Sequence, residues 1–302
     1  MNLLHQKYPN EIINQLKTKK YLYLKLGSVE MNVCGHENNI DHLPSQFPPD
    51  QLVKTKNSID QYVRKNAGFY FKQPYKDKYD ATNSRDAFSI FITLYVNAML
   101  KADCNFLYQF HVNDYKRLFH RNLHRFKSLV FEEEIGIYLE LFEYYTTVLN
   151  KKILIVSSMI DTMKVQINKM KKLFPNYNIK VENIIFYKSF NTIEGNATHS
   201  NWYESFCIMR DEIKKQKFDY CFLGCGSYGP PLADFIYSEM DCSSFSIGAT
   251  IQLLFGITGK RWESRLRHDK YFYCKYRNEH WIKPLQHEIP KNHKDVEDGC
   301  YW

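Results

Sequence analysis

The sequence predicts an α/β protein with a largely parallel sheet covered by helices, of the Rossmann-like kind. Three observations support this prediction. Strand and helix patterns alternate through the second half of the chain, as they do in parallel sheets. A strand-like run over 218–223 leads directly into a glycine-rich loop and then into a helix pattern. Finally, 44% hydrophobic residues in a chain of 302 residues suffice for a substantial core.

The first half of the chain begins with an amphipathic helix pattern over 3–19 and a β-rich run over 21–26. The strand pattern stops at Gly27, so Glu30 is expected at or just past a strand end. Further expected elements are a loop over 38–51, helices over 52–66, 86–100 and 135–149, and a strand over 105–110. Residues 1–150 would form an N-terminal half that carries this acidic strand-end loop.

Residues 151–302 would form a C-terminal half built from β-α-β units. Its first strand, 151–158, is apolar and ends in hydroxyl groups, among them Ser157. The other expected elements are strands over 179–186, 220–223 and 244–247, and helices over 161–173, 202–215 and 232–240. Ligands of such sheets bind at the carboxyl ends of the strands, so Ser157, the loop 224–229 and Gly248 should line one crevice.

The glycine-rich loop Gly224-Cys225-Gly226-Ser227-Tyr228-Gly229 predicts a phosphate-binding site. Glycine lets the backbone turn tightly and approach a ligand closely, and the prolines that follow suit the first positions of a helix. The start of that helix would offer N–H groups and a positive dipole end to an anion. A dinucleotide enzyme is disfavoured, because 245–250 lacks the acid that binds ribose about 20 residues after such a loop.

A formal charge of +8 favours anionic partners, such as nucleotides, acidic glycans, nucleic acid or a membrane surface. The densest basic run, 116–127, has apolar residues at helical spacing. It predicts either a solvated helix face or a surface for an acidic acceptor or for peripheral membrane contact. His120 and His124 within it lie four residues apart, but no third ligand is near, which disfavours a zinc site.

Eight cysteines without a C-x-x-C pair argue against a disulfide framework and against a zinc knuckle. The N-terminus has no apolar signal core, and no apolar run approaches the about 18 residues that a spanning helix needs. We therefore expect a soluble protein of a reducing cytoplasm.

Four ordered blocks in roughly the last half of the chain resemble a family of GT-D-like glycosyltransferases, found in polysaccharide gene clusters and some large viruses. They are GCGSYGPPLAD at 224–234, QLLFGITGKRWE at 252–263, NEHWIKP at 278–284 and EDGCYW at 297–302. The resemblance implies a GT-D-type architecture and transfer of a sugar from a nucleotide-diphosphate sugar to a glycan or glycoconjugate acceptor, with no nucleic-acid partner. A non-catalytic nucleotide- or glycan-binding protein of the same fold is the alternative.

An N-terminal block extends this resemblance. The family carries Arg-x-Gly-Asp-Gly-Glu at an early strand end, where this chain has Lys25-Leu26-Gly27-Ser28-Val29-Glu30. Gly27 and Glu30 match, whereas Lys25 replaces the arginine and Ser28 replaces the first acid of the pair that helps hold Mn²⁺ or Mg²⁺ in metal-dependent members. The resemblance thus implies Glu30 as the metal-binding acid, whereas the loss of the first acid puts a conventional metal site in doubt.

The implied reaction leaves negative charge on a departing diphosphate, which positive groups must stabilise, and an inverting reaction also needs a base. The expected catalytic residues are Glu30, Arg261 and Glu263. The expected donor-binding residues are Lys25, Gly27, Ser28, Ser157, Gly224, Gly226, Ser227, Tyr228, Gly229, Gly248, Gln252, Lys260 and Trp262. A structural alternative stays open for residues 261–263, as a corner with Trp262 in the core.

Overall fold

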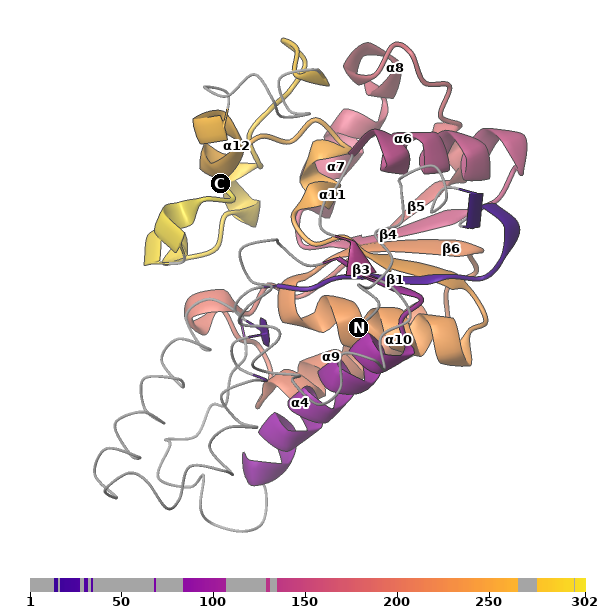
Figure 1. The fold of residues 1–302 in the computed structure, drawn as a ribbon. Helices are drawn as coiled ribbons and strands as arrows, with labels where there is room; N and C mark the ends of the chain where they lie inside the picture. Colours follow the sequence, from indigo (N-terminus) through magenta and orange to yellow (C-terminus); the bar gives the residue numbers. More distant parts are fainter. Residues whose placement is uncertain are drawn as a thin grey trace, which may run out of the picture.

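The computed structural model describes residues 14–15, 17–27, 30–31, 34, 68, 84–106, 129–130, 135–265, 276–295 and 297–302. A seven-stranded sheet lies at the centre of this part, and all of its neighbouring strands are parallel (Figure 1). Its order is β3-β2-β1-β7-β6-β4-β5. The strands are β1 (Leu22–Lys25), β2 (Cys104–Phe106), β3 (Leu129–Val130), β4 (Ile153–Ser157), β5 (Ile184–Lys188), β6 (Tyr220–Gly224) and β7 (Ser243–Ser246). The predicted α/β class is confirmed.

The two predicted halves of the chain share this sheet. Strands β1 to β3 come from the first 150 residues and β4 to β7 from the rest. They join where β1 pairs with β7, with Leu22 opposite Ser244 and Leu24 opposite Ser246.

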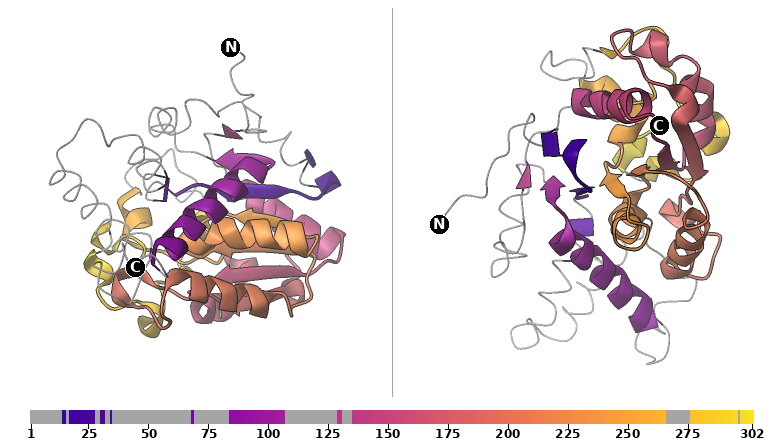
Figure 2. Two further views of the ribbon diagram at one scale, coloured as in Figure 1. Left: turned by 90° about the horizontal axis from the view of Figure 1, so that it is seen from below. Right: turned by 90° about the vertical axis from the view of Figure 1, so that its right-hand side faces the viewer.

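Helices cover both faces of the sheet (Figures 1 and 2). One face carries α6 (Ile135–Glu143), the π-helical turn Tyr144–Val148, α7 (Ile160–Ile167), α8 (Met170–Leu173) and α11 (Thr250–Leu253). The other carries α4 (Ser84–Lys101), α9 (Trp202–Ile213) and α10 (Gly229–Glu239), which lie side by side in Figure 2. The helix α12 (Lys260–Arg265) and the three short 3₁₀ turns Gln286–Glu288, His293–Asp295 and Glu297–Gly299 belong to the C-terminal segment.

Alternation along the buried strands divides the core into two clusters. In and around β1, Tyr21 and Tyr23 pack into the cluster under α6, α7 and α11, whereas Leu22 and Leu24 pack under α4 and α10. Because successive side chains of a strand point to opposite faces, a strand with apolar residues at every position is one that is covered on both sides.

The observed elements follow the predicted ones, with differences at several ends. The predicted helix over 161–173 is divided into α7 and α8, and the predicted helix over 135–149 consists of α6 and a π-helical turn. Strand β5 starts at Ile184 rather than at 179, because a 3₁₀ turn, Val181–Asn183, precedes it. Helix α10 starts at Gly229 rather than at 232, since the two prolines occupy its first positions. The predicted elements over 38–51 and 52–66, and the basic run 116–127 with its two histidines, lie outside the described residues.

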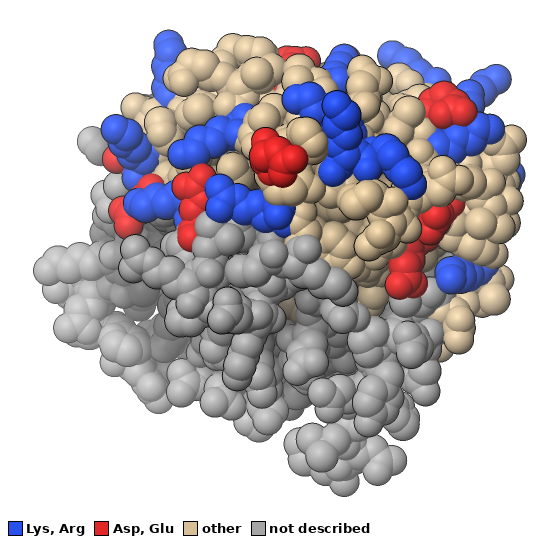
Figure 3. All heavy atoms as spheres, turned by 90° about the horizontal axis from the view of Figure 1, so that it is seen from above, with Lys and Arg blue, Asp and Glu red and all other residues tan. Residues whose placement is uncertain are grey.

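Within the described part of the chain, no helix has both the length and the apolar character needed to cross a membrane. Figure 3 shows the face that is uppermost in Figure 1, where lysine and arginine side chains predominate over acidic ones among the coloured residues. The exposed lysines of α7 and α8 are Lys164, Lys171 and Lys172. The surplus of positive charge is therefore visible on the surface.

Candidate functional site at the carboxyl edge of the sheet

The candidate site lies where the chain leaves two neighbouring strands in opposite directions. Ser157 at the end of β4 is the register partner of Gly224 at the end of β6. After β4 the chain enters α7 on one face, and after β6 it enters α10 on the other. Such divergence leaves a crevice at the carboxyl ends of the strands. The predicted placement of Ser157 beside the glycine-rich loop is therefore observed.

The glycines of the loop are required by its packing. A Cβ on Gly224 would come within 2.6 Å of the carbonyl oxygen of Gly248 and would also clash with the Ile251 side chain. A Cβ on Gly229 would lie 2.5 Å from the Ser246 hydroxyl. Gly226 has φ +57°, a left-handed conformation that glycine adopts without steric cost. The loop thus packs directly against the end of β7.

The start of α10 offers fewer free donors than the sequence predicts. The amide of Tyr228 donates to the Cys225 carbonyl at 3.3 Å, and the amide of Gly229 donates to the carbonyl of Gly226. The next two residues, Pro230 and Pro231, have no N–H group. An anion at this loop would therefore be bound by the amides that precede Tyr228.

The side chains of Ser227 and Tyr228 hold the loop to α9. The indole of Trp202 donates from Nε1 to the Ser227 hydroxyl at 2.9 Å, and its ring is stacked on Tyr228 with centroids 5.0 Å apart. The Tyr228 hydroxyl lies 3.0 Å from Thr192 Oγ1, which itself donates to the carbonyl of Gly68. Both loop side chains are buried in these internal contacts.

Lys25 brings a positive charge to the same edge of the sheet. It is the last residue of β1, and its Nζ donates to Thr250 Oγ1 at 2.7 Å, across the end of β7. The Nζ also lies 5.3 Å from the centroid of the Phe106 ring. The Lys25 stem passes beside Gly248, whose φ is +55°, and a Cβ on Gly248 would be 3.9 Å from Lys25 Cδ. Lys25 is thus placed between the ends of β1, β2 and β7.

Glu30 lies against Gly27, directly after β1. A Cβ on Gly27 would overlap the carboxylate of Glu30 and would lie 2.8 Å from its Cδ, so a side chain here would displace that carboxylate. The Glu30 side chain is buried, with 8% of the residue exposed. Its charge adds to the effect of burial in raising the pKa of the Cys34 thiol, one turn further on. Ser28 lies outside the described residues.

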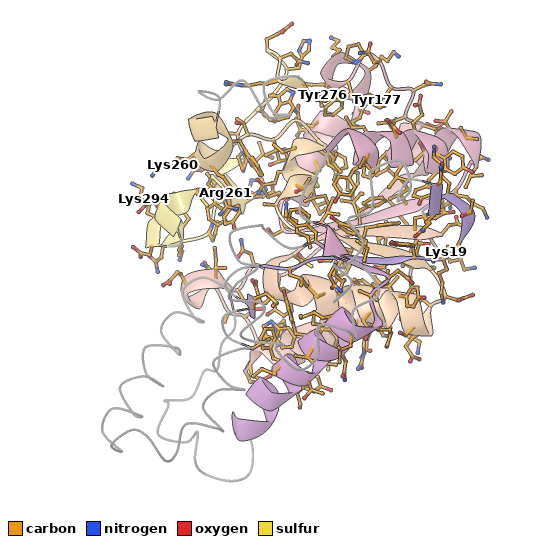
Figure 4. All side chains as sticks on the ribbon, in the orientation of Figure 1. Lys19, Tyr177, Lys260, Arg261, Tyr276 and Lys294 are labelled. Atoms are coloured by element: carbon orange, nitrogen blue, oxygen red, sulfur yellow. The ribbon has the colours of Figure 1, made fainter. Side chains whose placement is uncertain are left out.

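Two expected catalytic residues, Arg261 and Glu263, lie in α12, which contacts the end of the chain. The amide of Arg261 donates to the Cys300 carbonyl at 2.7 Å, and its guanidinium lies 4.4 Å from the centroid of the Tyr301 ring. Glu263 is 3.7 Å from the ammonium of Lys283. Figure 4 shows Lys260 and Arg261 on the side of the molecule opposite Lys19, which precedes β1, so they lie on the side that the carboxyl ends of the strands face.

Gln252 and Trp262 link this segment to the sheet. The Trp262 indole donates from Nε1 to Gln252 Oε1 at 3.3 Å. The side-chain nitrogen of Gln252, Nε2, is 3.2 Å from the sulfur of Met159, which follows β4. Both residues are buried, so Trp262 is in the core, as the structural alternative for 261–263 expects.

The sequence patterns did not predict a charged cluster that lies at the ends of β4 and β5. Ligating atoms of Asp161, His287 and Glu288 lie within 4.8 Å of one another. Lys188 Nζ is 2.5 Å from Asp161 Oδ2, which lies 3.0 Å from His287 Nε2. These two contacts lower the pKa of Asp161 below its usual value. The lysine already supplies the positive charge that a metal ion would bring.

Glu288 in this cluster caps α7. Its carboxylate accepts hydrogen bonds from the backbone amides of Asp161 at 2.7 Å and Thr162 at 2.9 Å, and from the Thr162 hydroxyl. A carboxylate at a helix start satisfies unpaired amides and meets the positive end of the helix dipole. No local sequence signal announces this cap, because Glu288 is 127 residues from Asp161.

Comparison of the chain with protein-family models, with curated proteins and with solved structures finds no match in any of the three.

Proposed function

We propose that the carboxyl edge of the sheet binds a nucleotide-diphosphate sugar and that the protein transfers its sugar to a glycan or glycoconjugate acceptor. The observation that supports this most directly is Lys25, whose ammonium is held between the ends of β1 and β7 by Thr250. The loop after β6 packs against the same end of β7. An ammonium beside a glycine-rich loop is suited to a diphosphate. The resemblance of the four C-terminal blocks supplies the choice of a sugar nucleotide.

The proposed chemistry assigns one role to each group. Lys25 and the amides of Gly226 and Ser227 would stabilise the charge that develops on the departing diphosphate, as preorganised donors do. Glu30 would accept the proton of the acceptor hydroxyl.

Glu30 is the residue expected to hold the Mn²⁺ or Mg²⁺ ion that metal-dependent GT-D glycosyltransferases use. Glu30 folds onto Gly27, and among the residues that the structure describes it belongs to no group of three potential ligands. Hard divalent cations need several oxygen ligands. The proposed mechanism therefore relies on Lys25 and backbone amides for charge stabilisation.

The test combines ligand binding with turnover. Melting temperature is measured with a panel of nucleotide-diphosphate sugars, nucleoside diphosphates and NAD(P), each with and without Mn²⁺ or Mg²⁺, because a ligand that binds the native state raises it. The stabilising donor is then assayed for sugar release and transfer. We expect one nucleotide-sugar group to stabilise the protein, and no stabilisation by any sugar nucleotide would refute the proposal.

Two variants locate the binding. Lys25→Gln should abolish most of the melting-temperature shift, whereas Lys217→Gln, at an exposed lysine on another part of the surface, should leave it intact. Glu30→Gln should keep donor binding and remove transfer. Donor binding by the wild type without transfer or hydrolysis would instead support the non-catalytic alternative, which the serine at position 28 favours.

A further inference from the structure

A pocket in the C-terminal segment contains none of the residues to which the proposed mechanism assigns a role. It has a volume of about 370 Å³ and opens to solvent. Its lining comes from the start of α12, from the last two 3₁₀ turns and from the final residue of the chain. The lining residues are Lys260, His293, Lys294, Asp298, Gly299 and Trp302. Lys260 and Lys294 lie close together in Figure 4, on the same part of the C-terminal segment.

Two lysines bring hydrogen-bond donors to this pocket. Lys260 Nζ donates to the backbone carbonyl of Asp298 at 3.2 Å. Among the described residues, no carboxylate lies within ion-pair distance of Lys260 or Lys294. The indole Nε1 of Trp302 is buried and has no hydrogen-bond partner there. This nitrogen has almost no accessible surface, so it lies within the wall of the pocket and does not face the open space.

The backbone that shapes the pocket is held in an uncommon conformation. Asp298 has φ +55° and Gly299 has φ +68°. This tight turn is closed by the amide of Trp302, which donates to the carbonyl of Gly299 at 3.1 Å. A left-handed conformation at a residue other than glycine costs roughly 1–2 kcal/mol. Such strain is retained where surrounding structure requires it, often at ligand sites.

We propose that this pocket is an anion site that takes the phosphate group of a small ligand. The two ammonium groups can only donate, so they select a group with several acceptor oxygens. Asp298 is the one acidic side chain in the lining, against two lysines. The volume is within the range of small-molecule sites, and the Trp302 ring provides a flat apolar surface beside the phosphate.

The phosphate could come from the diphosphate of the donor or from a phosphorylated acceptor. Only the first source depends on the proposed transferase function. In that case the C-terminal segment and the glycine-rich loop would bind the same ligand, whereas an acceptor phosphate would bind independently of the loop.

The probe is inorganic pyrophosphate, titrated calorimetrically into the full chain at low salt. Lys294→Gln should weaken binding at least about tenfold, the loss expected for one charge-assisted hydrogen bond. Lys260→Gln removes the second ammonium group, so it should weaken binding as well. Lys217→Gln is the matched control for a change of net charge and should have no effect.

Gly226→Val separates this site from the loop. If it leaves pyrophosphate binding unchanged, the pocket stands alone and an acceptor phosphate is its source. If both Gly226→Val and Lys294→Gln weaken binding, the donor diphosphate spans the two. Binding that is lost in Gly226→Val but unaffected by Lys294→Gln would overturn the pocket proposal while leaving the proposed function intact. Equal effects of Lys294→Gln and Lys217→Gln would overturn it too, because they indicate nonspecific charge attraction.

Discussion

Ser157 and Gly224 face each other across the parallel register at the ends of β4 and β6, and the chain leaves them toward opposite faces of the sheet. The two strand ends therefore lie at the base of the candidate crevice, and the pairing of β4 with β6 fixes their positions. Gly224 has a further role, since the absence of a side chain there admits the carbonyl of Gly248. The loops after β6 and β7 are thereby fixed to each other.

Gly229→Ala should destabilise the protein although alanine is the better helix former. The new methyl group would lie 2.5 Å from the buried Ser246 hydroxyl, and overpacking of this kind costs about 1–3 kcal/mol. Removing that hydroxyl in Gly229→Ala/Ser246→Ala should restore most of the loss, because the next contact, to Ser246 Cβ, is 3.7 Å away. Urea unfolding of the two single variants and the double variant measures this coupling. Additive losses would contradict it.

Glu288→Ala should lower the free energy of unfolding by about 2–3 kcal/mol. The substitution leaves the amides of Asp161 and Thr162 without the carboxylate that accepts their hydrogen bonds. Glu239→Ala, at an exposed acid in the last turn of α10, is the control and should change stability little. Thermal and urea unfolding compare the two, and similar losses would show that the cap contributes nothing.

The Asp161 carboxylate should make stability fall in acid. Hydrogen bonds from Lys188 and then His287 lower its pKa in the folded protein. A lowered folded-state pKa means that the ionised form stabilises the fold above the unfolded value, about 4, and that this contribution is lost as the pH falls through the folded value. Asp161→Asn should therefore be less stable than the wild type at pH 7, and the difference should shrink toward pH 2. A difference that is the same at both pH values would exclude this linkage.

Tyr228→Phe should separate the structural role of this residue from ligand binding. The variant loses the hydroxyl contact with Thr192 but keeps the ring stacked on Trp202, so a loss of about 1 kcal/mol is expected. Affinity for nucleoside diphosphates should not change, and a marked drop in affinity with little change in stability would place Tyr228 in the ligand site. Trp202→Ala, which removes the fully buried ring, should cost about 3–5 kcal/mol.

The sequence predicted best what local pattern determines. The alternation from β4 to β7 and the turn at Gly226 follow from periodicity and from glycine's freedom at positive φ. Contacts between distant segments were not predictable in this way. The cap by Glu288 and the hydrogen bond from Trp202 to Ser227 depend on which helices pack together, and a single sequence does not encode that as a pattern. The donor set of α10 is smaller than predicted for a local reason. The preceding turn uses the amides of Tyr228 and Gly229, and the next two residues are prolines.

The pairing of β1 with β7 sets the order in which this chain can fold. Tyr21 and Ser243, linked by a backbone-to-hydroxyl hydrogen bond at the start of that pairing, are 222 positions apart. Such a contact can form during synthesis only after nearly three quarters of the chain has followed β1. Until then the edge of β1 that pairs with β7 is exposed, and unpaired apolar strand edges promote aggregation. We therefore expect slow refolding that benefits from chaperones, and a fragment starting at residue 151 would leave the edge of β7 unprotected.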